Sequence, residues 1–419
     1  MPISDTPAAR HAQAQRGLNE SSFSRLGAPV CHGPEGIRFD FNYGCRVQVP
    51  VDGWRVRMTD LDTHNVVFDE TVEAGVPVSS RRKYFVRMLL QVFDDTRCVF
   101  EHAFDASARP VLVRIASGAL GDSLAWVPVI DAFRERHRCD LHVVLPRHLH
   151  PLFRAGYPGL SFVGEGELAA CAGVPAAATS EVPDFYATYH VGLFSPYDER
   201  DHQPTDPRIS SMQDAAAYML GVPPGERRPR LVLADDARRI AQPYVCIATQ
   251  ATAQCKYWNN PRGWPTLIAH LNRLGYRVLC IDRDRAYGLP GALNHMPAGA
   301  EDFTGERPLQ ERANLLAHAD FFIGLGSGLS WLAWAVGTPV VLISGFSHPK
   351  TEFDTPWRVI NFHACNSCFN DTSFEFDPDD FNWCPRRVDK AQRFQCTSAI
   401  SPEFVMRAVD SLIDERCLA

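Results

Sequence analysis

The stretch from Ala319 to Ile343 constrains the fold of this chain more than any other segment. It places an uninterrupted apolar run, Phe321 to Ile323, directly before the glycine-rich sequence 324–328. An apolar run without polar alternation is typical of a parallel strand that is covered on both faces. A helix follows, ends near Gly337 and leads into a second apolar run. The segment therefore predicts a strand, a glycine loop, a helix and a second strand, the repeating unit of an α/β fold.

The glycine loop is expected to face a ligand. Ligands of open α/β sheets bind at the carboxyl ends of the strands, and glycines let the backbone approach a bound group closely. Ser327 is predicted to cap the following helix, whose N-terminus favours anions. The alternative is a tight strand-to-helix turn that contacts no ligand, and the loop alone does not choose between the two.

The α/β pattern occurs in two halves. In the first, Val111 to Ile115 reads as a buried strand, residues 116–123 as a loop and Leu124 to His137 as a helix. A second series starts at Tyr244, after a stretch rich in proline and glycine at 221–229 that reads as a linker. We therefore predict two α/β domains, 109–229 and 230–419, with facing doubly wound sheets and a cleft between them.

The residues before the first half show a different period. Apolar and polar residues alternate between Gly36 and Phe104, and turn residues interrupt the pattern regularly. This predicts a small antiparallel sandwich or barrel at 29–108, preceded by a polar tail at 1–28. Its expected strands are Ile37–Phe41, Cys45–Val49, Trp54–Met58, Val66–Phe68, Tyr84–Met88 and Cys98–Phe100.

The composition of the chain argues against a nucleic-acid-binding protein and against a membrane-spanning protein. The chain has 419 residues, 45% of them hydrophobic and 22% charged, and its net charge is −7. An acidic balance gives no support to nucleic-acid binding. No apolar run reaches the ~18–20 residues of a membrane span, and the first residues lack the features of a signal peptide. We therefore expect a cytoplasmic protein without a membrane span.

In each α/β half, one charged residue of interest follows the first strand. Asp122 lies near Gly118 and Gly121 and would face the cleft as a general base, although an aspartate there also often caps a helix. Lys256 follows the strand that starts at Tyr244, in a loop of small polar residues that includes Thr249 and Gln250. A lysine and hydroxyl groups at the carboxyl end of a strand suit a phosphate group. The alternative for Lys256 is a solvated surface lysine.

Four of the 13 cysteines crowd into one segment. Cys365 and Cys368 form a C-x2-C pair, Cys384 follows after fifteen residues and Cys396 after eleven more. This spacing suits a tetrahedral metal site, and four thiolates without an open position indicate a structural role. Thiolates accept iron or zinc, and the spacing does not choose between them. The alternative is four ordinary thiols, as expected for the other nine cysteines in a reducing compartment.

These features together resemble the bacterial autotransporter heptosyltransferases, a branch of the heptosyltransferase superfamily that modifies self-associating autotransporter adhesins. The resemblance extends from about Gly36 to the C-terminus. It rests on the loop 119–122, on Lys256-Tyr257-Trp258, on the loop 326–330 and on the cysteine segment, which we name as residues 361–397. The cysteine segment is the most specific of the four, because lipopolysaccharide heptosyltransferases lack it.

The resemblance implies a GT-B fold and an inverting transferase that moves heptose from ADP-heptose to serine residues of an adhesin. Asp122 would be the base, and Lys256 would neutralise the departing ADP. The donor would contact Thr249, Gln250, Lys256, Gly326, Ser327, Gly328 and Leu329. The four cysteines would hold one iron ion, with zinc as the alternative, and the chain would assemble as a dodecamer.

The chain also departs from the superfamily pattern. Lipopolysaccharide heptosyltransferases have an acidic residue where this chain has Gly326, and a histidine where it has Trp331. Asp320, Asp282 or a backbone group are candidates to replace the missing carboxylate. Two alternatives to the protein heptosyltransferase stay open: a lipopolysaccharide-core heptosyltransferase, and a non-catalytic, metal-stapled scaffold that binds an adhesin.

Overall fold

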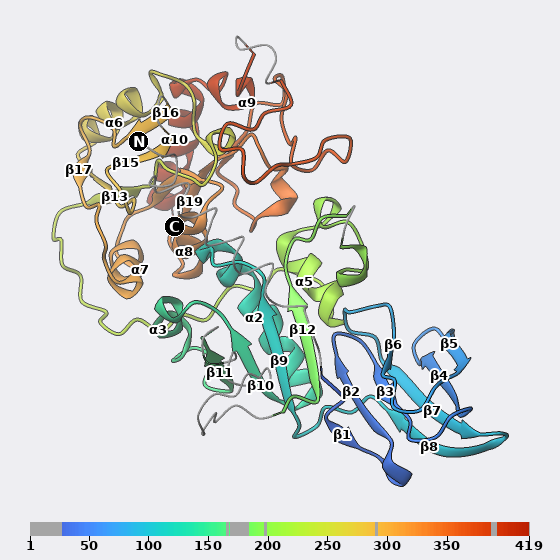
Figure 1. Ribbon diagram of the computed structural model, residues 1–419. Coiled ribbons are helices and arrows are strands. Elements are labelled where there is room, and N and C mark those ends of the chain that lie inside the picture. The colour runs from blue at the N-terminus through green and yellow to red at the C-terminus, as the bar shows by residue number, and fades with distance from the viewer. Residues whose placement is uncertain are drawn as a thin grey trace, which may run out of the picture.

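The computed structural model of the protein describes residues 27–164, 167, 184–196, 199–289, 292–386 and 392–418. Figure 1 shows two α/β units stacked on each other, with a strand-rich region beside the first unit. The α/β class that the sequence predicts is confirmed by two largely parallel sheets, one in each unit.

The second unit contains a six-stranded parallel sheet in the order β17-β14-β13-β18-β19-β20. Every residue of its three central strands is buried, because helices and loops cover both faces, as the apolar run before the glycine loop predicts. The strands are β13 (Tyr244–Ile247), β14 (Arg277–Cys280), β17 (Glu301–Asp302), β18 (Phe322–Leu325), β19 (Val340–Ile343) and β20 (Arg358–Val359). The helices are α6 (Gly263–Arg273), α7 (Leu309–Ala317), α8 (Gly328–Ala335), α9 (Gln395–Ser398) and α10 (Pro402–Leu418), and β15 (Ala286–Leu289) and β16 (Ala292–His295) form a hairpin.

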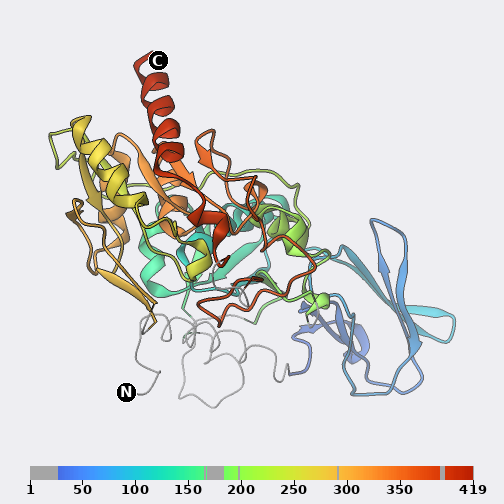
Figure 2. The ribbon, with the colours of Figure 1, turned by 90° about the horizontal axis from the view of Figure 1, so that it is seen from above.

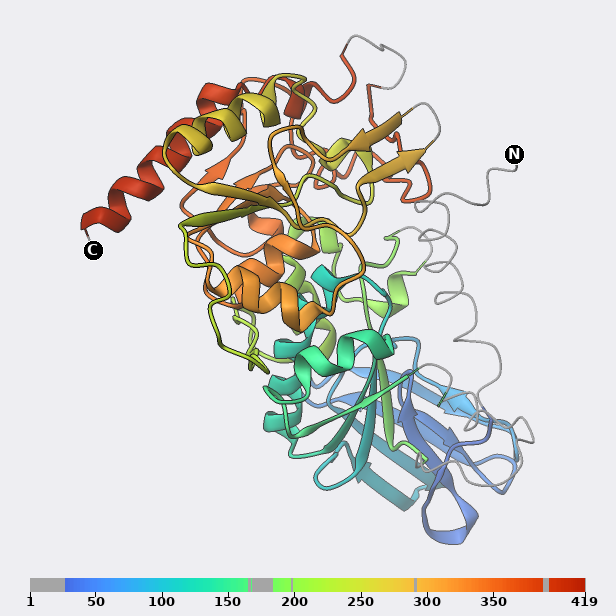
Figure 3. The ribbon, with the colours of Figure 1, turned by 90° about the vertical axis from the view of Figure 1, so that its left-hand side faces the viewer.

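The last helix, α10, packs against α6, where His270 and Asp410 lie 2.8 Å apart. Its C-terminal end extends away from the rest of the chain (Figures 2 and 3). Among the described residues, no helix is both long and apolar enough to span a membrane.

The first unit continues directly into the strand-rich region. Its parallel strands are β9 (Pro110–Ile115), β10 (Asp140–Val144), β11 (Leu160–Val163) and β12 (Ala187–Val191), and its main helices are α2 (Leu120–His137), α3 (His150–Phe153) and α5 (Met212–Leu220). Strand β12 pairs with β2 (Arg38–Asn42), which pairs antiparallel with β1 (Cys31–His32) and β3 (Arg46–Gln48), and β3 pairs with β6 (Val78–Ser79). One sheet therefore spans the predicted boundary near residue 108, and only part of the strand-rich region forms a sheet of its own.

That separate sheet has the order β5-β4-β7-β8 and is antiparallel. Its strands are β4 (Arg55–Asp60), β5 (Val66–Thr71), β7 (Met88–Asp94) and β8 (Arg97–Ala103). Strand β4 alternates between partly buried and buried residues along its length, so the period-two pattern read from the sequence is confirmed there.

The expected strand at Tyr84–Met88 is wrong, since β7 begins only at Met88. The backbone N–H of Phe85 donates to the carbonyl of Met219 at the end of α5, over 2.8 Å. The Phe85 ring is buried against Phe133 and Tyr189 of the first α/β unit. This segment therefore anchors the strand-rich region to α5 instead of extending the sheet.

The position of Phe85 requires a glycine at position 221. Gly221 ends α5 in the left-handed conformation (φ +61°), and a Cβ there would lie 2.2 Å from Cδ1 of Phe85. Gly221→Ala is expected to destabilise the protein by about 2 kcal/mol or more, because strain and overlap add. Thermal unfolding measures the loss. Gly275→Ala is the control, since Gly275 also has a positive φ but an added Cβ would meet nothing within 4 Å. Equal melting of the two variants would contradict the overlap.

Candidate active site

Two helix N-termini, one from each α/β unit, meet at a pair of glycines. A Cβ on Gly121 of α2 would lie 3.4 Å from the Cα of Gly328 in α8. A Cβ on Gly328 would lie 3.1 Å from the backbone nitrogen of Gly121. The missing side chains thus let the two backbones touch. The indole of Trp331 packs against the same junction, where a Cβ on Gly121 would approach it to 3.2 Å.

Both helix ends lack a capping side chain. The residues at the N-cap positions are Ala119 for α2 and Ser327 for α8, and neither side chain makes a cap hydrogen bond. Ser327 thus occupies the predicted N-cap position without the predicted cap. Uncapped N-termini present backbone N–H groups and the positive end of the helix dipole, so their convergence favours an anion.

Asp122 lies in the first turn of α2 and not in the loop that the sequence predicts. The helix begins at Leu120 instead of Leu124, because the Ser117 hydroxyl accepts from the N–H of Ala119 and stabilises the turn before it. The N-cap position belongs to Ala119, so Asp122 does not act as the N-cap residue.

Burial raises the pKa of Asp122 above the usual value of 3.8, and a hydrogen bond to Ser117 and the charge of Lys256 oppose that rise. The effect of Lys256 shows that the two predicted residues lie within electrostatic reach, although 134 positions in the chain separate them. A carboxyl group with a raised pKa beside a cation and two helix N-termini has the properties of a general base.

Lys256 ends a short 3₁₀ helix, Gln254–Lys256, that follows β13. Its ammonium lies 5.6 Å from the centre of the Phe346 ring. The N–H of Gln254 donates to the carbonyl of Phe381 over 2.8 Å, and Asn259 donates to the hydroxyl of Thr397 over 2.9 Å. The cysteine segment therefore forms hydrogen bonds with the chain both before and after Lys256.

Thr249 and Gln250 are fixed by Asp282. Both the N–H and the hydroxyl of Thr249 donate to Oδ2 of Asp282, over 2.8 and 2.9 Å, and the N–H of Gln250 approaches Oδ1 at 3.3 Å. The Gln250 side chain donates to the carbonyl of Asp284. These side chains thus shape the loop that leads to Lys256.

The loop from Gly326 to Leu329 is partly exposed, as a ligand loop must be. Of the suggested replacements for a carboxylate at Gly326, Asp320 accepts from the N–H of Tyr244 at the opposite end of the sheet. Asp282 is committed to Thr249 and Gln250. The carboxylate that does lie at Gly326 belongs to Glu352, which follows β19 and which no sequence motif marks.

The four predicted metal ligands lie around the loop after β19. Cys368 packs in a cluster with Phe346 and Trp383, and a Cβ on Gly345 would lie 3.1 Å from the Cβ of Cys396. Burial raises the pKa of Cys396 to about 12, and the nearby thiols of Cys365 and Cys384 raise it as well.

The same cluster contains Cys255, which belongs to no sequence motif and directly precedes Lys256. Across the part of the chain that the structure describes, no group of three or more His, Cys, Asp or Glu side chains is placed to hold a metal ion. The four thiols supply the donor atoms that iron and zinc accept in proteins, so the chemistry of the set fits such an ion.

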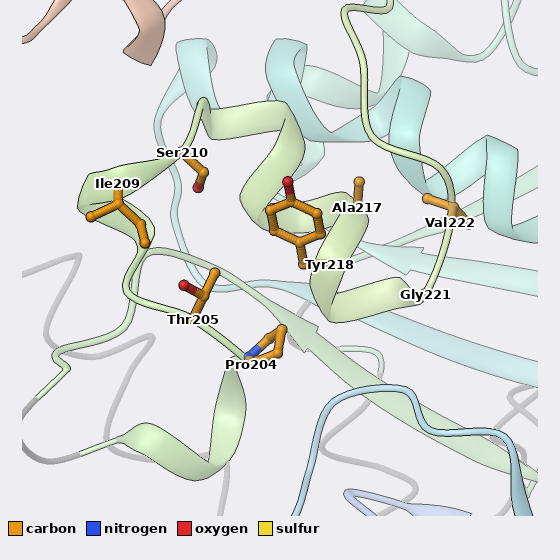
Figure 4. Close-up of a pocket in the computed structure, with 8 residues that line it drawn as sticks. All are labelled: Pro204, Thr205, Ile209, Ser210, Ala217, Tyr218, Gly221 and Val222. Carbon is orange, nitrogen blue, oxygen red and sulfur yellow. The ribbon is translucent and has the colours of Figure 1, made fainter. Parts of the chain in front are cut away.

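A pocket with a volume of about 540 Å³ lies elsewhere, between α5 and the 3₁₀ turn Pro207–Ile209 (Figure 4). Its lining contains hydroxyl groups but no carboxylate, histidine or amine, and none of the predicted site residues. The residues are Pro204, Thr205, Ile209, Ser210, Ala217, Tyr218, Gly221 and Val222. None of the charged residues named as candidates for the reaction lines this pocket.

Two known protein families match parts of the chain. Residues 33–96 match the family described as glycosyltransferase TibC, N-terminal domain. Residues 187–372 match glycosyltransferase family 9 (heptosyltransferase). The second match includes Lys256 and the glycine loop.

Several relatives match nearly the whole chain. The autotransporter heptosyltransferase BAHTCr of Citrobacter rodentium is 47% identical over 400 residues, which cover 95% of this chain and 94% of the relative. BimC of Burkholderia thailandensis, described as an inactive autotransporter heptosyltransferase, is 42% identical over 419 residues, which cover 99% of this chain and 94% of BimC.

A crystal structure has the same fold over nearly its full length. It is that of TibC from enterotoxigenic Escherichia coli, described as an iron-containing dodecameric glycosyltransferase. The TM-score is 0.87 at 46% identity, covering 94% of this chain and 100% of that chain. TibC has also been solved with ADP-D-β-D-heptose, in a structure with a TM-score of 0.86 and 45% identity.

These matches cover both the strand-rich region and the two α/β units, and they confirm an α/β glycosyltransferase fold with a β-rich N-terminal region. The chain belongs to the autotransporter heptosyltransferase family.

Proposed function

We propose that this protein is an active, inverting heptosyltransferase that moves heptose from ADP-heptose to serine hydroxyl groups of an autotransporter adhesin. The observation that carries this proposal is the pairing of Asp122 and Lys256 at the junction of two uncapped helix N-termini. TibC, which is similar over nearly the whole chain, has been solved with ADP-heptose. By analogy with TibC, the protein is proposed to act as a dodecamer, and a cytoplasmic location is proposed from the sequence.

In the proposed step, Asp122 accepts the proton of the serine hydroxyl as that oxygen attacks the anomeric carbon. The bond between this carbon and the diphosphate oxygen breaks, and ADP leaves with the electron pair. One base and no covalent intermediate are required. Negative charge grows on the diphosphate, where Lys256 and the N–H groups at the start of α8 would stabilise it. Thr249 and Gln250 would shape the donor loop through Asp282.

The rate is expected to fall on acidification at a higher pH than for an ordinary carboxylate. Only the ionised carboxylate accepts a proton, and the pKa of Asp122 is raised, so activity is present above that pKa and is lost as the pH falls through it. Because the charge of Lys256 lowers this pKa, Lys256→Met should move the acid limb to still higher pH. The pH profiles of kcat/KM for both proteins measure the shift. Superimposable acid limbs would contradict the coupling.

We further propose that Cys365, Cys368, Cys384 and Cys396 hold one iron ion, with zinc as the alternative. The convergence of Cys368 and Cys396 on the loop after β19 supports this, as does the description of TibC as iron-containing. A four-thiolate ion would crosslink the cysteine segment and offer no open position to substrate. The cysteines would thereby stabilise the loop of Lys256, which the segment already holds through Phe381 and Thr397.

Cys384→Ser is expected to release the ion and lower the melting temperature, because a structural metal site contributes directly to folding. Elemental analysis of protein produced without added zinc and thermal unfolding measure the two effects. Cys98→Ser is the control, since Cys98 is an exposed thiol in β8. Unchanged metal content and melting in the Cys384 variant would contradict the site. A stoichiometric zinc content would replace iron but keep the four ligands.

The similarity to BimC, which is described as inactive, favours one competing function without catalysis. In that case we propose a scaffold that binds an adhesin. A candidate adhesin co-expressed with and without the protein separates the two. The enzyme adds mass to the adhesin in heptose units, whereas a scaffold co-purifies with an adhesin of unchanged mass. Transfer to lipopolysaccharide core and not to the adhesin would identify the lipid acceptor instead.

A further inference from the structure

A carboxylate from a later segment of the chain fills the space that Gly326 leaves open. A Cβ on Gly326 would lie 2.8 Å from Oε1 of Glu352 and 3.6 Å from Oγ of Ser347. Any side chain larger than hydrogen at position 326 would therefore displace Glu352. The glycine loop thus has a carboxylate beside it, although its own sequence contains no acid.

Glu352 is held in a fixed orientation. The Ser347 hydroxyl donates to Oε1, and the Arg358 guanidinium donates to Oε2 over 3.0 Å. Arg358 also donates to the carbonyl of Phe353 over 2.8 Å, and the side chains of Glu352 and Arg358 are each 7% exposed. Each carboxylate oxygen has two lone pairs, so both can accept a further hydrogen bond.

The position of Glu352 suits a neutral hydrogen-bond donor better than a phosphate. Arg358 neutralises its charge, so the pair does not cancel the attraction that the α8 N-terminus has for an anion. An ionised phosphate oxygen has no hydrogen to donate to the carboxylate, whereas sugar hydroxyl groups donate to carboxylates strongly. The ring of Phe346 lies beneath the ammonium of Lys256, and the next residue, Ser347, donates to Glu352. Glu352 and Lys256, the residue proposed to bind the diphosphate, therefore both contact the loop that follows β19.

We propose that Glu352 binds the hydroxyl groups of the donor sugar and thereby distinguishes ADP-heptose from ADP. This inference rests on the proposed function, because it assigns the sugar half of the same donor site. Ser347 and Arg358 are positioning residues that hold the carboxylate, and Gly326 is required because the carboxylate occupies the volume of its side chain.

The test compares two ligands on each variant by isothermal titration. Wild-type protein is expected to bind ADP-heptose more tightly than ADP. Glu352→Gln should weaken ADP-heptose binding by about tenfold or more, since a hydrogen bond to a charged acceptor is lost, and should leave ADP binding unchanged. Glu301→Gln is the control, because it removes a Glu–Arg pair with Arg277 from the same sheet, away from the glycine loop.

Equal weakening of both ligands, or no weakening of either, in Glu352→Gln overturns the assignment. If that variant does not fold, Gly326→Ala serves instead, because it displaces the carboxylate and keeps all its partners. A Gly326→Ala protein that still prefers ADP-heptose over ADP then overturns the assignment. If wild-type protein does not prefer ADP-heptose over ADP, the proposed donor is wrong. If wild-type protein has this preference and Glu352→Gln keeps it, only the role of Glu352 is wrong.

Discussion

Replacing Asp122 with asparagine is expected to lower the rate of heptose transfer by about 10²- to 10⁴-fold, the usual contribution of a general base. The amide has nearly the same shape as the carboxylate but does not accept the proton of the acceptor hydroxyl. Asp122 lies in the first turn of α2, burial raises its pKa and the charge of Lys256 acts on it, which are properties expected of a general base. The rate of mass increase of a purified adhesin with ADP-heptose measures the loss.

Binding of ADP-heptose to Asp122→Asn should be retained, since the base contacts the acceptor and not the diphosphate. Asp214→Asn is a matched control, because Asp214 lies in the first turn of α5 on the same unit and accepts from the N–H of Gly225. Full transfer by Asp122→Asn would show that another group takes the proton.

Lys256→Ala is expected to lower the transfer rate by about 10²- to 10³-fold, comparable to the loss of one preorganised donor at a developing charge. Unlike the change at Asp122, it should also weaken ADP binding, because the ammonium acts on the diphosphate both before and during departure. Titration with ADP and single-turnover transfer measure the two effects separately.

Lys350→Ala is the control for a general loss of positive charge, because Lys350 is an exposed lysine of the same α/β unit. If Lys256→Ala keeps wild-type affinity for ADP and wild-type rate, the lysine has no role at the donor. Weaker ADP binding with an unchanged rate would assign it to ground-state binding only.

Much of the fold was predictable because local patterns decide it. The apolar runs before Gly324 and after Gly337 became β18 and β19. Burial on both faces of a parallel sheet imposes continuous apolar strands, so these strands are visible in the sequence itself. The boundaries of α2 and β7 were missed because a turn at Ser117 and a contact of Phe85 with α5 override local preference.

The candidate site divides in the same way. Asp122, Lys256 and the glycine loop could be named from the sequence, because each follows a buried strand and ligands gather at the carboxyl ends of such strands. The spacing of the four cysteines predicts a metal site, and that site stays a prediction. By contrast, Glu352 lies 26 positions after Gly326 and is marked by no motif.

The sequence by itself therefore determined the α/β class, the family and the residue types available for the reaction, since these depend on periodicity and on short motifs. Only the tertiary structure decided which groups meet. It brought the backbones of Gly121 and Gly328 into contact, joined β2 to β12 in one sheet and set Glu352 beside Gly326. A glycine leaves empty the space that a side chain would occupy, and the group that fills this space depends on how distant segments pack. The glycine loop thus obtains its carboxylate from a neighbouring segment in space and not from its own sequence.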